Sequence, residues 1–155
     1  MDLEVHWESP FDLFRSKSDL IYEVEDFESL PDGPGVYVFA RVHGESVCPL
    51  YVGKALSLRK RIDQQLNNLR LMRAIERSPK GSRLLYAGEF IGKGGQSVAK
   101  AISVVESALI STAMVEGFEL INVQGTKTLA HSITSTGNRE ARSWLPENVI
   151  RLRRA

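Results

Sequence analysis

Cysteine and histidine are scarce in this sequence of 155 residues. Cys48 is the only cysteine, so no disulfide can form within the chain, and a reducing compartment such as the cytoplasm is expected. The three histidines are scattered along the chain, and none has the spacing of a zinc-binding motif. The sequence therefore excludes a disulfide-stabilised fold and a zinc site built from cysteine and histidine.

A signal peptide and a long apolar run are also lacking. The N-terminal residues are acidic, whereas a signal peptide begins with basic residues and continues with apolar ones. No apolar run approaches the length of a membrane span, so we expect no membrane contact. With 43% hydrophobic and 25% charged residues, the composition is that of a single globular domain over residues 1–155.

The net charge of +1 is small, but the charges are unevenly distributed. Residues 1–32 contain ten acidic and two basic side chains, whereas residues 33–155 contain eighteen basic and nine acidic ones. We interpret residues 1–32 as an acidic extension that packs on the domain, and residues 124–155 as a basic extension. A basic body is what a phosphate-binding surface needs, so the charge distribution favours nucleic acid as the partner.

Hydrophobic periodicity predicts the secondary structure. Alternating apolar residues indicate strands, and apolar residues three and four positions apart indicate helices. The predicted strands are 35–41, 50–53 and 83–91, and the predicted helices are 57–77 and 96–116. The polar stretch 42–49 is expected to be a loop that joins the first two strands as a hairpin. This order predicts an α/β fold with a small, mainly antiparallel, three-stranded central sheet flanked by helices.

The first two predicted strands each carry a tyrosine close to a glycine. The first strand opens with Gly35-Val36-Tyr37, and the second ends with Tyr51-Val52-Gly53. Lys54 follows at once, and Arg61 lies ten positions after Tyr51 in the first turns of the predicted helix. Two phenols and several cations should therefore gather at one end of the sheet.

These paired motifs resemble those of the GIY-YIG nuclease superfamily. The resemblance extends over residues 33–123, and further positions match at the usual spacing of the family: Lys54, Ala55, Leu58, Arg61, Glu106 and Asn122. Glu106 lies inside the second predicted helix, and Asn122 lies in the segment 118–123 that should return beside the site.

The resemblance implies an endonuclease that depends on a divalent metal and hydrolyses DNA phosphodiester bonds. Tyr51 would be the general base or water activator, Arg61 would stabilise the phosphoryl group, and Glu106 would hold one Mg²⁺ or Mn²⁺ ion. Three further residues would orient and support this site: Tyr37, Lys54 and Asn122. A homodimer is compatible with the small size of the chain if two strands are cut.

The residue types are consistent with this chemistry. Phosphodiester hydrolysis needs an activated water, neutralised phosphoryl charge and help for the leaving oxygen. One carboxylate suffices for one hard cation that keeps most of its waters and binds the substrate phosphate. Glu106 has no cation partner on its own helix, so it needs a metal, or a salt bridge to the first helix as the simpler alternative. For Arg61, the simpler alternative is an arginine at the edge of the core.

One position departs from the family pattern. Gln65 stands where family members have a tyrosine or a histidine, and glutamine is not a base near neutral pH. The alternative interpretation is therefore a catalytically silent nucleic-acid-binding module of the same fold. The joint presence of Tyr51, Arg61 and Glu106 favours the enzyme, because a silent site has no need for all three.

Overall fold

The computed structural model describes residues 2–122, 128–134, 136–144 and 148–154. The central strands are β1 (Glu4–Trp7), β2 (Phe11–Arg15), β3 (Tyr22–Val24), β4 (Gly35–His43), β5 (Ser46–Ala55) and β6 (Ser82–Ile91). The helices that pack on them are α1 (Leu58–Leu66), α2 (Leu69–Arg77) and α3 (Val98–Val115). A single turn of 3₁₀ helix covers Phe27–Ser29.

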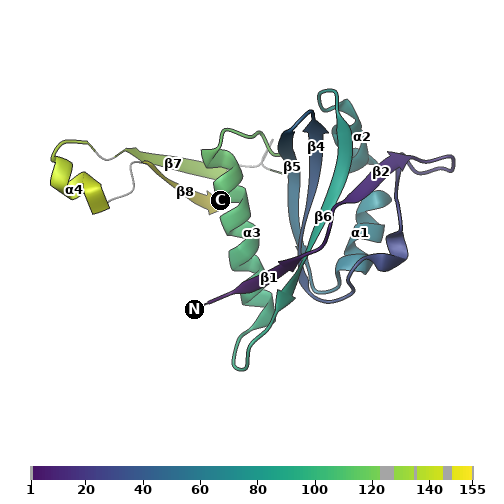
Figure 1. The fold of residues 1–155 in the computed structure, drawn as a ribbon, viewed down its shortest axis with the longest axis horizontal. Helices are drawn as coiled ribbons and strands as arrows, with labels where there is room; N and C mark the ends of the chain where they lie inside the picture. The colour runs from purple at the N-terminus through teal and green to yellow at the C-terminus, as the bar shows by residue number, and fades with distance from the viewer. Residues whose placement is uncertain (1, 123–127, 135, 145–147, 155) are drawn as a thin grey trace.

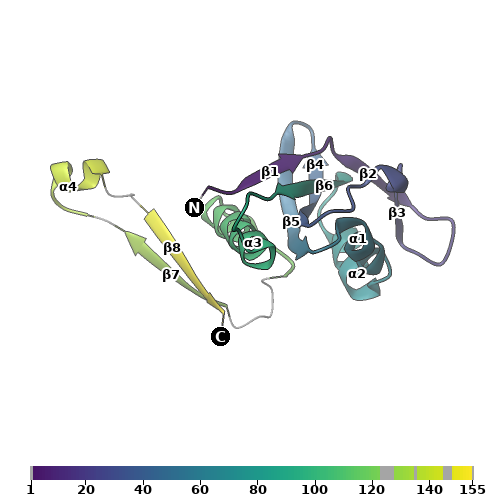
Figure 2. The ribbon, with the colours of Figure 1, turned by 90° about the horizontal axis from the view of Figure 1, so that it is seen from below.

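All central strands belong to one antiparallel sheet of six strands. The order is β3-β2-β6-β4-β5, and β1 pairs with the remaining length of β6. Helices α1 and α2 cover one face of the sheet, and α3 lies on the other face (Figures 1 and 2). The predicted α/β architecture with an antiparallel sheet between helices is therefore confirmed, but the expected number of three strands is wrong.

The additional strands come from the acidic N-terminal segment. Strand β1 pairs with residues 88–91 of β6, β2 pairs with residues 83–85, and β3 continues the sheet beyond β2. Without them β6 would be an open edge with unpaired backbone groups. The strands β1, β2 and β3 of the acidic segment are therefore part of the sheet, which explains why the sheet has six strands and not three.

The first hairpin is longer than its sequence pattern indicated. Pairing continues to His43 and Ser46, so the predicted loop shrinks to a tight turn in which Gly44 has a φ of +61°. A bulge opposite Phe39 and Ala40 inserts Leu50, and this places both Leu50 and Tyr51 against the core under α1 and α2. β5 is an edge strand, where proline and polar residues are tolerated. The sequence pattern of residues 42–49 therefore indicated a loop, although most of this stretch is paired in the hairpin.

The predicted helix 57–77 is two helices. The helix is interrupted at Asn68, which is the N-cap of α2. Its side chain accepts a hydrogen bond from the backbone N–H of Leu71 at 3.2 Å. The apolar stripe continues through the break, so periodicity alone could not reveal it. The second predicted helix, 96–116, agrees with α3 to within two residues at each end.

Two groups of apolar side chains hold the layers together. The larger core lies between the sheet and the helices α1 and α2, and its fully buried members include Tyr37, Phe39, Leu58, Ile62, Met72 and Ile75. On the other face α3 buries Ile102 against Phe90 and Ile110 against Val52. By length and composition alone, α3 is long and apolar enough to cross a membrane, contrary to the expectation that no apolar run approaches that length. Helices that pack in the cores of soluble proteins share these properties.

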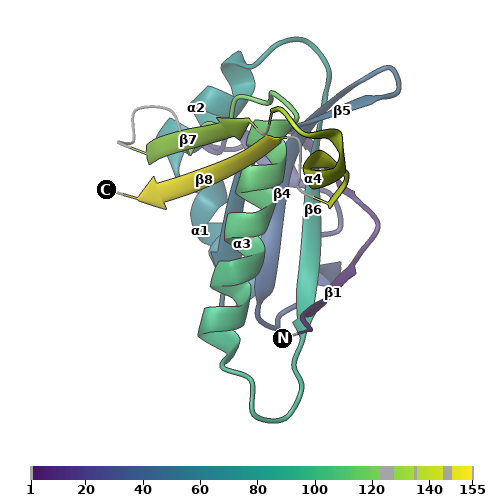
Figure 3. The ribbon, with the colours of Figure 1, turned by 90° about the vertical axis from the view of Figure 1, so that its left-hand side faces the viewer.

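The C-terminal segment adds a second, two-stranded antiparallel sheet. Its elements are β7 (Thr128–Thr134), α4 (Arg139–Trp144) and β8 (Asn148–Arg154). Strand β8 contacts α3, and the hairpin lies on the side of α3 that faces away from the central sheet (Figures 2 and 3). Residues 123–127, which include the end of the predicted segment 118–123, lie outside the described residues.

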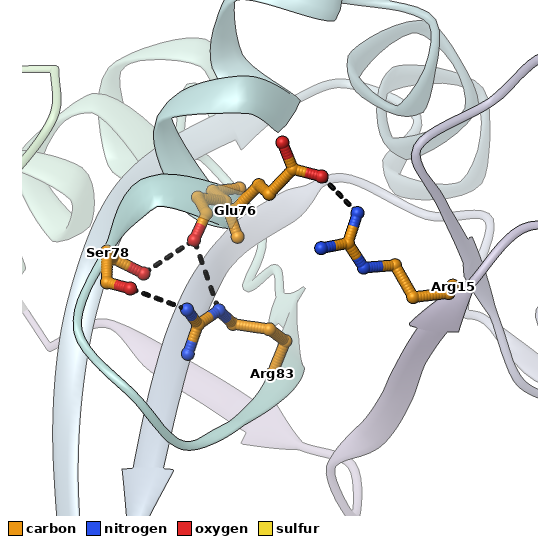
Figure 4. A network of polar contacts seen from close by, with 5 residues as sticks. Arg15, Glu76, Ser78 and Arg83 are labelled. Atoms are coloured by element: carbon orange, nitrogen blue, oxygen red, sulfur yellow. Dashed lines mark hydrogen bonds and ion pairs between the residues drawn. The ribbon is translucent and has the colours of Figure 1, made fainter.

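Arg83→Met should lower the free energy of unfolding by about 3 kcal/mol, because Arg83 ties the end of α2 to β6. Arg83 is 8% exposed, and its side chain donates to the carbonyl oxygens of Ile75 (3.1 Å), Ser78 (2.9 Å) and Gly81 (2.9 Å). Figure 4 shows the bond to Ser78. The matched control is Arg15→Ala, which removes an exposed ion pair to Glu76 and should cost less than about 1 kcal/mol. Urea unfolding measures both, and equal losses would contradict this role for Arg83.

Candidate functional site

The edge strand β5 carries two of the six predicted site residues, Tyr51 and Lys54. Side chains alternate along a strand, so Tyr51 and Gly53 face α1 and α2, whereas Val52 and Lys54 face α3. The predicted residues are therefore divided between the two sides of one strand. The strand lies at the end of the sheet order, and hydrogen bonds from Ile121 and Asn122 to Leu50 and Val52 cover part of its outer edge.

On the first side, two tyrosines and a glutamine form what we call the phenol cluster: Tyr37, Tyr51 and Gln65. The rings of Tyr37 and Tyr51 stack with centroids 6.1 Å apart and planes at 26°. The side-chain N–H₂ of Gln65 donates to the hydroxyl of Tyr37 at 2.7 Å and to that of Tyr51 at 3.3 Å. The side-chain N–H₂ of Asn68 donates to the side-chain oxygen Oε1 of Gln65 at 3.2 Å, and this fixes the orientation of the Gln65 amide.

The glycine of the second motif has a steric reason. Gly53 pairs with Tyr37 across the hairpin, and the ring of Tyr37 lies over it. A Cβ atom at position 53 would lie 2.4 Å from both the hydroxyl oxygen and the Cζ atom of Tyr37, which is far inside van der Waals contact. Glycine is therefore required for Tyr37 to reach Gln65.

The two tyrosines differ in their surroundings. Tyr37 is 1% exposed, whereas Tyr51 is only partly buried. Burial raises the pKa of Tyr37 well above its ordinary value, and the hydrogen bond from Gln65 and the charge of Arg61 oppose this only in part. Tyr37 therefore stays protonated at physiological pH, where it can donate a hydrogen bond but cannot accept a proton as a base.

Arg61 lies on α1, one turn before Gln65, and its side chain is exposed. Residues four positions apart on a helix lie on the same face, so Arg61 is on the face of α1 from which Gln65 contacts both phenols. Among the described residues, none accepts a hydrogen bond or an ion pair from this guanidinium. Arg59, by contrast, is occupied by the carbonyl oxygens of Glu28 and Leu30. The positive charge of Arg61 is thus available for an anion from outside.

On the second side of β5, Lys54 and Glu106 form an ion pair with 2.7 Å between Nζ and Oε2. The side chain of Glu106 is 10% exposed and that of Lys54 is 33% exposed. The cation that this buried carboxylate needs therefore comes from β5 and not from the first helix. Within the described part of the chain, no group of three or more histidine, cysteine, aspartate or glutamate residues could hold a metal.

Asn122 binds the backbone of β5 between the two sides. Its side chain donates to the carbonyl oxygen of Val52 at 2.8 Å and accepts from the N–H of the same residue at 3.5 Å. The backbone N–H of Ile121 donates to the carbonyl oxygen of Leu50 at 2.7 Å. Asn122 is therefore a positioning residue, since it holds the strand that carries Tyr51 and Lys54.

The structure brings Tyr37, Tyr51 and Arg61 together on one side and Lys54 with Glu106 on the other. Among the described residues, no hydrogen bond joins the two groups. The linking role of Gln65 was not predicted, because its sequence position indicated only a residue that could not act as a base. Its spacing of four residues from Arg61 on one helix was the signal that both face the same way.

Comparisons with protein-family models, with curated proteins and with solved structures found no match for this chain. The resemblance to the GIY-YIG superfamily therefore depends on the motif residues themselves, and the geometry around β5 is the basis on which a function can be proposed.

Proposed function

We propose that this protein is a divalent-metal-dependent endonuclease of the GIY-YIG type that hydrolyses DNA phosphodiester bonds. The observation that carries the proposal is the arrangement of two phenols, tied together by Gln65, on the same helix face as the exposed guanidinium of Arg61, which no described residue engages. A phosphodiester placed at this edge would meet a cation for its charge and a hydroxyl for its water.

The environments of the two tyrosines support different roles for them. Tyr37 stays protonated, so it serves as a hydrogen-bond donor that orients the neighbouring groups. Tyr51 is the less buried of the two, and its oxygen accepts a hydrogen bond from Gln65. That donor would stabilise negative charge on the Tyr51 oxygen, so Tyr51 is the residue that we assign to water activation. Gln65 supports Tyr51 and does not replace it as a base.

The single carboxylate of Glu106 fits one hard cation that retains most of its waters and also binds the substrate phosphate. Such an ion would supply charge neutralisation at the phosphate. A metal ion at Glu106 would have to compete with the ammonium group of Lys54 for the same carboxylate. With a cation at Glu106, the ammonium group of Lys54 would be able to bind the substrate phosphate.

A catalytically silent nucleic-acid-binding module of the same fold is the second candidate. The specific observation in its favour is that Lys54 already neutralises Glu106, at 2.7 Å. In such a module this pair would be purely structural, and Arg61 would bind a phosphate without assisting its hydrolysis. The two candidates differ in turnover and not in DNA binding.

Incubation with supercoiled plasmid, with and without Mg²⁺ or Mn²⁺, tests the proposal. Wild-type protein should nick or linearise the plasmid only with metal, and Tyr51→Phe should reduce the rate on the order of 10²-fold because the proton acceptor is lost. Tyr37→Phe is the matched variant, and the shape of its pH–rate profile should be that of the wild type because Tyr37 does not titrate in this range. Binding of the plasmid without any metal-dependent cleavage would select the silent module.

A further inference from the structure

A cavity of about 500 Å³ lies beside the early part of β5, away from the phenol cluster. It is enclosed by the end of α2, by β4 and β5, and by the segment that follows α3. The residues that matter for its chemistry are Arg41, Cys48, Leu50, Arg77, Phe118 and Ile121. None of them belongs to the site assigned above.

The described lining of the cavity contains two arginines, Arg41 and Arg77, against one carboxylate, Glu119. Arg41 donates to the carbonyl oxygen of Lys80 at 3.0 Å and to the sulfur of Cys48 at 3.4 Å, and its buried Nε atom has no partner. Within the described part of the chain, neither Arg41 nor Arg77 forms an ion pair, although Glu119 also lines the cavity. Arg41 is held only by neutral acceptors among the described residues, and a guanidinium in such a place favours an anionic ligand, of which phosphate suits its geometry.

The rest of the wall is apolar. Leu50 is buried, and Phe118 and Ile121 are partly buried, so an aromatic ring and two aliphatic side chains border the space between the arginines. An aromatic ring next to cations is the combination that binds nucleotides from single strands, with the base stacked and the phosphate paired. The volume is within the range of small-molecule sites.

The position of the cavity connects it to the phenol cluster. Leu50 and Tyr51 are consecutive, and the bulge directs both toward the side of α1 and α2. At about 3.3 Å per residue, Cys48 lies about 10 Å along the strand from Tyr51. A nucleic-acid strand that runs along this side of β5 would therefore reach both places.

We propose that this cavity binds an unstacked nucleotide of the DNA strand, close to the bond that is cut. Its phosphate pairs with Arg41 and Arg77, and its base stacks on Phe118. This inference rests on the proposed nuclease function and names the form of DNA that the site selects, namely a strand from which one nucleotide can leave the stack.

Fluorescence anisotropy without metal tests the inference through binding alone. The probes are a labelled ten-residue oligothymidylate and a ten-residue abasic strand with the same number of phosphates. Arg77→Ala should weaken both and reduce the slope of log K against log salt by about 0.7. Phe118→Ala should weaken only the oligothymidylate, about tenfold, because the abasic strand has no base to stack. Arg73→Ala is the matched control, since Arg73 is exposed on the same helix but does not line the cavity, and its affinities should be those of the wild type.

If Phe118→Ala does not fold, Phe118→Leu replaces it in the binding experiment, because leucine keeps an apolar side chain of similar volume without the aromatic ring. The inference is overturned if Arg77→Ala binds like Arg73→Ala, or if the Phe118 variants weaken both strands equally. Cavity variants that bind like wild type, beside plasmid cleavage that depends on Tyr51, would reject the cavity and retain the nuclease. Base-dependent binding through Phe118 without cleavage would retain the nucleotide site and reject the nuclease.

Discussion

Arg61→Ala is expected to slow DNA cleavage on the order of 10³-fold while it weakens DNA binding only modestly. The guanidinium is exposed beside the phenol cluster, and no described residue occupies it. Its positive charge therefore stabilises the transition state more than the bound substrate, because the phosphoryl group gains negative charge in the transition state. The folding stability should change little, because no internal hydrogen bond is lost. Single-turnover cleavage and gel-shift affinity at one fixed salt concentration measure the two effects separately.

Lys60→Ala is the matched control for this prediction. Lys60 is the adjacent exposed cation on α1, and removing it changes the net charge by the same amount as removing Arg61. It should alter affinity slightly and leave the single-turnover rate near that of the wild type. Equal rate losses in both variants would mean that α1 contributes only general electrostatic attraction, and the assignment of Arg61 would be wrong.

Glu106→Gln should abolish cleavage and metal binding while DNA binding persists or becomes tighter. The substitution keeps the size of the side chain and an oxygen for Lys54, but it removes the only carboxylate assigned to the metal. Affinity for DNA should not fall, because a negative charge near the phosphates disappears. Electron paramagnetic resonance of Mn²⁺ measures metal binding directly, so the readout does not depend on turnover.

Lys54→Met separates metal binding from the structural ion pair. Without metal, the nearly buried Glu106 then loses the ammonium group of Lys54 while its other contacts remain, and the free energy of unfolding should fall by up to about 3 kcal/mol. If Glu106 binds a cation, Mn²⁺ should raise the melting temperature of this variant more than that of the wild type, because the competing ammonium is gone. If Mn²⁺ has no such effect and Glu106→Gln still cuts at the wild-type rate with Mg²⁺, Glu106 is only a salt-bridge partner.

The sequence by itself determined the elements that carry the motifs. Alternation located the cores of β4, β5 and β6, and apolar spacing located the helices that pack against them. The glycine and tyrosine of the paired motifs face each other because the hairpin pairs Tyr37 with Gly53. These features are local, since they depend on residues within one strand, one helix or one hairpin.

Only the tertiary structure decided the rest. Strands β1 and β2 of the acidic segment pair with β6, and Lys54 meets Glu106, which is 52 positions away in sequence. Gln65 joins two phenols from two different strands. The physical reason is that each of these contacts satisfies a buried polar group or an open strand edge. A sequence pattern shows that such a group needs a partner, but only the fold brings that partner to it.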